Sequence, residues 1–135
     1  MERIINSLKK IGKVGKSVIV KSAKIEETRE ALERLDNTEV VMLDSQSLDF
    51  APNEKEFFAK LKNCIQAGKT LIVNNFECLQ YGSMISILSA FDDRKILRIG
   101  KEEFNVTANG FMMIAIINPS AKLEEAILDR FFVLQ

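Results

Sequence analysis

Six side chains stand where they could do chemistry, because each lies at or just beyond the end of an apolar run or a short predicted helix. They are Lys21, Lys24, Asn74, Asn75, Asn118 and Arg130. Lysine and arginine can bind phosphate as cations, whereas asparagine carries no charge and cannot accept a proton as a carboxylate does. We therefore expect no catalytic residue among the six. Glu77 is the first carboxylate after Asn75, at a point where the chain is expected to be turning.

The composition removes several classes of site. The chain of 135 residues has no histidine, which excludes histidine-based triads and most zinc sites. Cys64 and Cys78 lie in apolar surroundings, so we expect small buried residues and no metal site. Nineteen basic residues balance nineteen acidic ones, which argues against binding of the whole chain to nucleic acid or to a membrane surface.

The apolar runs also bear on localisation. None approaches the length of about 18 residues that a membrane-spanning helix needs. The residues after Met1 form no signal-peptide core. We therefore expect a cytoplasmic protein with no membrane partner.

The apolar pattern predicts alternating strands and helices. Five apolar runs predict strands at 18–20, 40–43, 71–73, 111–117 and 131–134. Helical spacing predicts helices over 2–11, 24–35, from Asn53 to Gly68, 83–91 and 121–129, with a small hairpin near 96–106. Strands that are apolar on both faces and separated by helices require a parallel sheet covered on both sides. The predicted fold class is therefore α/β, a three-layer sandwich.

Three motifs follow one another in the second half of the chain. They are Gly68-Lys69-Thr70-Leu71-Ile72-Val73-Asn74-Asn75, then Asn118-Pro119, then Glu125-Ala126-Ile127-Leu128-Asp129-Arg130-Phe131. In order and spacing, residues 68–135 resemble the core of an AAA+ ATPase of the dynein-related and MoxR-like branch. The resemblance implies a P-loop NTPase sheet in the order fifth, first, fourth, third, second strand. It also implies one domain over 1–135 without the family's C-terminal helical lid, because the sequence stops after the fifth strand.

The same resemblance implies a role for each motif. Asn74 and Asn75 occupy the Walker B positions, where the family has an aspartate that holds magnesium and a glutamate that activates water. Asn118 occupies the sensor 1 position and would orient water or the terminal phosphate. Arg130 occupies the arginine-finger position and would reach into a neighbouring subunit's site. Simpler alternatives are that Asn118 caps the turn before the proline and that Arg130 pairs with Asp129 or Glu125 on the surface.

The phosphate-binding motif departs from the family pattern. A working loop needs Gly-x-x-x-x-Gly-Lys-Ser/Thr between a strand and a helix. Gly15-Lys16-Ser17 lies before the first strand, and residues 21–24 after it contain no glycine to permit close backbone approach. We therefore expect Walker A to be lost, and we expect neither ATP nor magnesium as a cofactor.

Three functions remain open. The first is a catalytically inactive AAA+-like interaction or regulatory module, a stand-in ring subunit or an inhibitor, whose partner is an AAA+ ATPase or a copy of itself. The second is a divergent NTPase that uses Lys21 or Lys24 for phosphate. The third is a nucleic-acid adaptor that uses residues 1–24, which carry seven basic side chains and one acidic. Residues 25–60 carry ten acidic and four basic side chains, so complementary charges also permit head-to-tail association.

Overall fold

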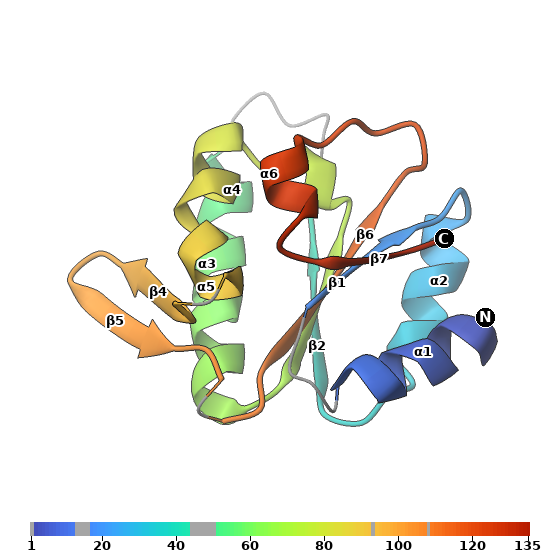
Figure 1. Cartoon of the computed structure of the whole chain (residues 1–135), viewed down its shortest axis with the longest axis horizontal. Helices are drawn as coiled ribbons and strands as arrows, with labels where there is room; N and C mark the ends of the chain where they lie inside the picture. The colour runs from blue at the N-terminus through green and yellow to red at the C-terminus, as the bar shows by residue number, and fades with distance from the viewer. Residues whose placement is uncertain (1, 13–16, 44–50, 93, 108) are drawn as a thin grey trace.

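Five parallel strands form the central sheet, in the order β2-β3-β6-β1-β7 (Figure 1). Their bounds are β1 (Val18–Lys21), β2 (Thr38–Met42), β3 (Thr70–Asn74), β6 (Met112–Ile117) and β7 (Phe132–Leu134). This computed structural model describes residues 2–12, 17–43, 51–92, 94–107 and 109–135. The α/β class and the predicted strand order are both confirmed.

Helices cover both faces of the sheet and create two apolar cores. On one face lie α1 (Glu2–Gly12) and α2 (Ile25–Leu32), packed on side chains such as Val18, Ile72 and Ile114. On the other lie α3 (Ala51–Ala67), the 3-10 turn η1 (Phe76–Cys78), α4 (Tyr81–Ser86), α5 (Leu88–Phe91) and α6 (Glu125–Leu128). Strand β6 is buried from Met113 to Ile117, which explains its continuous apolar sequence.

A separate two-stranded hairpin projects beside α3 and α5 (Figure 1). It consists of β4 (Ile96–Ile99) and β5 (Glu102–Asn105), paired antiparallel as predicted. The buried Leu97 and the neighbouring Phe104 anchor it to the core below α3 and α5.

Several element bounds differ from the predicted ones. The helix expected over 83–91 is broken at Ile87, whose side chain is nevertheless buried as expected. The helix expected to begin at Asn53 begins at Ala51, so Asn53 lies inside it. Helix α6 is shorter than the expected 121–129. Gly68 ends α3 as expected, with a positive φ of 70°.

The sheet register decides which candidate residues can meet. Asn74 lies opposite Met42 and Ile116, and Lys21 lies opposite Ile117, so these residues share the carboxyl edge of the sheet. Arg130 precedes β7, whose first residue lies opposite Val18, and therefore belongs to the opposite, amino edge. In the described parts of the chain no helix has both the length and the apolar character to cross a membrane.

Candidate functional site

The carboxyl edge of β1, β3 and β6 is the candidate site, because ligands of open α/β sheets bind outside the carboxyl ends of the strands. Residues 22–24 connect β1 to α2 at this edge, Asn75 follows β3, and Asn118 follows β6. What the edge can bind depends on which polar groups remain available there.

The connection from β1 to α2 is closed by its own hydrogen bonds. The backbone N–H of Ser22 donates to the carbonyl of Ile117 at 3.0 Å, so this residue continues the strand pairing. The Ser22 hydroxyl lies 2.7 Å from that of the buried Thr28 and accepts the backbone N–H of Lys24 at 3.1 Å. The three-residue connection is thus drawn down onto α2. It leaves no open ring of backbone N–H groups of the kind that cradles phosphate.

The first turn of α2 is also unfavourable for an anion. It contains Glu26 and Glu27, whose negative charges occupy the region that the helix dipole would otherwise offer to a phosphate. The Lys24 Nζ lies 4.0 Å from Glu27 Oε2 in a largely exposed ion pair. Lys21 is half-buried and, by strand alternation, continues the sheet face of Ile19. No hydrogen bond or ion pair among the described residues joins either lysine to Asn74, Asn75 or Asn118.

Asn74 is buried beneath the edge, with 1% of its surface exposed. Its side chain lies within hydrogen-bonding reach of Glu26 on α2. The Arg29 guanidinium, which donates to Glu26 at 2.6 Å, holds the pKa of that carboxyl below its usual value, and Asn74 contributes to the same effect. The Asn74 Oδ1 atom has no hydrogen-bond partner among the described residues. Asn74 is therefore a buried amide that faces α2.

Asn75 shapes the turn that follows β3. Its backbone is left-handed, with φ 59° and ψ 49°, a conformation that asparagine adopts more readily than most residues. Its Nδ2 donates to the carbonyl of Leu43 at 3.2 Å, and its own carbonyl accepts the N–H of Cys78 at 2.8 Å. Both contacts tie the turn to the end of β2 and to η1.

Asn118 and Glu77 are engaged with the backbone at the end of β6. Glu77 Oε2 accepts the N–H of Asn118 at 2.8 Å, which gives this carboxylate a structural contact. Asn118 Oδ1 accepts both the N–H of Ser120 at 2.9 Å and its hydroxyl at 2.7 Å. These bonds form the turn around Pro119, as the simpler sequence interpretation expected.

Arg130 lies at the other edge of the sheet and folds back on its own helix. Its Nη1 donates to the carbonyl of Ala126 at 2.9 Å, and the residue is half-buried. None of the ion pairs between described residues joins it to Asp129 or Glu125. The reason is that the helix carbonyl is reachable within one turn and competes with solvent-exposed carboxylates.

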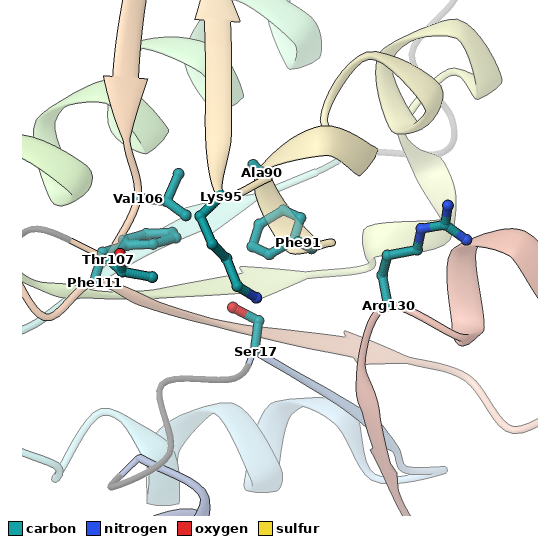
Figure 2. Close-up of a pocket in the computed structure, with 8 residues that line it drawn as sticks. All are labelled: Ser17, Ala90, Phe91, Lys95, Val106, Thr107, Phe111 and Arg130. Atoms are coloured by element: carbon teal, nitrogen blue, oxygen red, sulfur yellow. The ribbon is translucent and has the colours of Figure 1, made fainter. Parts of the chain in front are cut away.

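A small cavity separates Arg130 from the hairpin strands. Its volume is about 10 Å³, room for about one water molecule. Figure 2 shows Lys95 and Ser17 pointing towards each other across it, while the Arg130 guanidinium points away from both. The cavity therefore does not connect Arg130 to a substrate-sized space.

The donor set at the carboxyl edge does not suit a magnesium–nucleotide group. Magnesium prefers anionic oxygens and a nearly octahedral shell, whereas Asn74 and Asn75 supply neutral amides and no carboxylate. Among the described residues no three cysteine or acidic side chains cluster as metal ligands would.

Sequence reasoning missed four residues that close this edge, namely Ser22, Glu26, Thr28 and Arg29. One signal was present, because Thr28 lies between Ile25 and Leu32 at helical spacing and so had to face the core. Glu26 and Arg29 carried no signal, since acid–base pairs three residues apart are typical of exposed helix surfaces.

No family model matches the sequence, and no curated protein is significantly similar to it. Solved structures do match. A DNA polymerase III gamma subunit-related protein of Thermotoga maritima is 13% identical, with a TM-score of 0.61 over 96% of this chain and 44% of its own. The S. cerevisiae Hsp104–ADP complex is 13% identical, with a TM-score of 0.54 over 88% of this chain and 28% of that one.

PCH-2 of C. elegans is 11% identical, with a TM-score of 0.50 over 90% of this chain and 34% of its own. All three are AAA+ proteins, and this chain spans less than half the length of each. At these identities the similarity concerns the fold alone. The order of the five parallel strands, the helices on both faces and the separate hairpin agree with it, and the chain therefore has an AAA+ fold.

Proposed function

We propose that this chain is a non-hydrolysing AAA+-like module of the dynein-related and MoxR-like branch. We propose that it acts through protein contacts, as a stand-in ring subunit or as an inhibitor of an AAA+ ATPase. The observation that carries the proposal is the closed connection between β1 and α2. Ser22 bonds to Thr28 and to the N–H of Lys24, so the segment where a phosphate loop would lie is a short structural link.

The Walker B positions support the same proposal. A hydrolytic site needs a carboxylate for the metal and another for the attacking water. Asn74 is instead a buried neutral amide within reach of Glu26, and Asn75 holds the turn to Leu43. The nearest carboxylate in sequence, Glu77, accepts the backbone N–H of Asn118 through Oε2, while its Oε1 has no hydrogen-bond partner among the described residues. Neither Walker B position thus supplies a carboxylate.

Arg130 is the residue through which the module could act on a neighbour. It lies at the amino edge of the sheet, opposite the edge of Asn74, so it can only serve a site in another chain. Its guanidinium would first have to exchange the bond to the Ala126 carbonyl for a phosphate. Lysine would not substitute well, because the planar guanidinium donates in a fixed fork.

The experiment uses the complex of this chain with the AAA+ ATPase that co-purifies with it. Phosphate release is measured with wild type, Arg130→Ala and Arg130→Lys at equal occupancy. If this chain is a stand-in subunit, both variants should lower the partner's rate of ATP hydrolysis. The loss can reach the factor of about 10³–10⁵ that an arginine finger supplied by another chain can contribute. If this chain lowers the partner's rate and the variants do so equally, it acts as an inhibitor without a finger. If the partner's rate is the same with and without this chain, the proposal fails.

Neither alternative function gains a specific observation. A divergent NTPase would need Lys21 and Lys24 to converge, but Lys24 pairs with Glu27 and Lys21 shares the sheet face of Ile19. A nucleic-acid adaptor would need basic and aromatic side chains interleaved on one surface, and the basic residues of 1–24 include no aromatic neighbour.

A further inference from the structure

A groove of about 540 Å³ lies between α1 and α2, on the face of the sheet opposite α3 (Figure 1). We call it the α1–α2 groove. Its apolar lining consists of Ile5, Leu8, Ala31, Leu35 and Met112. Three exposed charged residues complete the lining, namely Lys9 from α1 and Arg34 and Asp36 from the turn after α2.

The two cations of the groove are not used within the described parts of the chain. Neither the Lys9 nor the Arg34 side chain forms an ion pair or a hydrogen bond with another described residue. Helix α1, which forms one wall, carries three basic side chains and one acidic. On α2, Arg29 is paired with both Glu26 and Glu33, which offsets part of the acidic charge of that helix. The open charges beside the apolar lining therefore favour an acidic occupant.

The groove offers an occupant no free strand edge. Met112 begins β6, which is paired with β1 on one side and with β3 on the other. The remaining lining residues belong to α1, to α2 and to the turn after α2. An extended peptide would therefore leave its own backbone groups unpaired where the groove covers them, whereas a helix bonds its backbone internally.

A small ligand fits the lining less well than a helix does. Pockets for small molecules orient their ligands through a few precisely placed polar groups within an apolar wall. The described lining contains no hydroxyl or amide side chain, and its charges are on exposed residues. An apolar floor between exposed cations is instead typical of a groove that binds an amphipathic helix.

We propose that the α1–α2 groove binds an acidic amphipathic helix of another protein. The apolar stripe of that helix covers the floor, and carboxylates on its two flanks face Lys9 on one wall and Arg34 on the other. Burial of apolar side chains supplies the attraction, and the two cations select acidic over basic helices. Asp36 favours the amino-terminal end of the bound helix beside it, because that end carries a partial positive charge. The inference stands apart from the proposed function, since it requires neither a closed carboxyl edge nor a contact through Arg130.

A contact of this size is expected to be weak. Helix α1 has 11 residues and is about 16 Å long, so the groove accommodates about three turns of a second helix. Such a contact buries less than the 1,200–2,000 Å² of a stable interface, taken as about that range for proteins in general. We expect a dissociation constant of about 10–100 µM that rises as salt is added.

The test uses a fluorescently labelled, end-capped peptide of about 14 residues as the probe, long enough for about four helical turns. It carries leucines at positions i, i+3, i+4 and i+7 and glutamates on both flanks of that stripe. One control peptide has the same residues in scrambled order, and a second has lysine in place of every glutamate. Anisotropy titration with the whole chain should show saturable binding of the acidic probe, and binding of both controls at least about tenfold weaker. The circular dichroism of the unlabelled probe should gain helical signal on binding, because so short a peptide is only marginally helical alone.

Charge reversal in the chain tests the two walls. Lys9→Glu and Arg34→Glu should each raise the dissociation constant of the acidic probe about three- to tenfold, as the loss and reversal of an exposed ion pair would. The double variant should bind the lysine peptide more tightly than wild type does. This gain cannot arise from a loss of folding.

Lys101→Glu is the matched control, because Lys101 is exposed at the turn of the β4–β5 hairpin and makes the same change of charge away from the groove. It should bind the acidic probe as wild type does. Four outcomes would overturn the proposal. The first is no saturable binding of the acidic probe below about 1 mM, and the second is equal binding of the scrambled peptide, which would indicate attraction by charge alone. The third is equal weakening in Lys101→Glu, and the fourth is a wild-type oligomer that excludes the probe and dissociates in Arg34→Glu, which would make a second copy the occupant.

Discussion

Asn74→Asp puts back the acidic residue that the AAA+ resemblance leads one to expect at the end of β3, and the structure predicts that this chain will not tolerate it. Asn74 is 1% exposed, and its amide nitrogen is the group that reaches Glu26. An ionised carboxylate has no proton to donate to Glu26, and it would be buried beside another carboxylate. The change therefore replaces a neutral amide with a desolvated charge that lies within reach of another carboxylate.

The magnitude follows from the desolvation of that charge. Burying an ion costs several kcal/mol unless it is paired, and Arg29, the cation beside Glu26, is already paired with Glu26 and Glu33. We expect a loss of about 2–4 kcal/mol in the free energy of unfolding at pH 8, which corresponds to a pKa raised by about 1.5–3 units in the folded state. The pKa of the new carboxyl at position 74 is raised in the folded state. The loss of unfolding free energy is therefore absent below the unfolded pKa of about 3.9, and it grows as the pH rises towards the pKa of the folded state.

The assay is urea unfolding of wild type and variant at pH 4.5 and pH 8. Asn118→Asp is the matched control, since Asn118 is exposed and its Oδ1 only accepts bonds from Ser120, which a carboxylate can also accept. The free energy of unfolding of the control should stay within about 0.5 kcal/mol of that of wild type at both pH values. If Asn74→Asp behaved like the control, Asn74 would not be buried against α2, and the account of the closed edge would be refuted.

Three further predictions concern the core and its supports. Ile114→Ala, in the middle of the fully buried strand β6, should lose about 2–5 kcal/mol in urea unfolding, and an unchanged midpoint would show that the strand is not central. Gly68→Ala should lower the free energy of unfolding by at least about 1–2 kcal/mol, because φ is +70° and a Cβ would meet a backbone carbonyl oxygen at 2.0 Å. Gly82→Ala, which has open space around the new Cβ, should not lower it. Burial raises the pKa of the Cys64 thiol to about 12, and the Glu39 carboxylate beside it adds to the effect. The free energy of unfolding should therefore fall as the pH rises from about 9 to 12, because only the unfolded thiol ionises over that interval. Cys64→Ala should show a shallower pH dependence over that interval, and equal slopes would contradict the buried thiol.

The strands were predictable because each is a short apolar run that no helix periodicity explains. The run from Phe111 to Ile117 is the clearest case, since only a strand covered on both faces needs apolar residues at every position. Their order came from the AAA+ resemblance. The break at Ile87 was not predictable, because the buried positions of α4 and α5 keep helical spacing across it.

The site was less predictable than the fold. The role of Asn118 in its turn followed from the proline beside it, a local signal. The partner of Asn74 lies on α2, far away in the sequence, and nothing near β3 indicates it. For Arg130 the simpler interpretation was a surface ion pair with Asp129 or Glu125, whereas its bond to the Ala126 carbonyl depends on where the helix actually stops.

Titration of the purified chain with MgATP in a calorimeter tests most directly whether the closed edge excludes nucleotide. The account predicts no saturable heat up to about 1 mM nucleotide, that is, no binding stronger than about −4 kcal/mol. Saturable binding in the micromolar range that is lost in Lys24→Ala would contradict it, because the nucleotide would then occupy the segment that Ser22 and Thr28 hold closed.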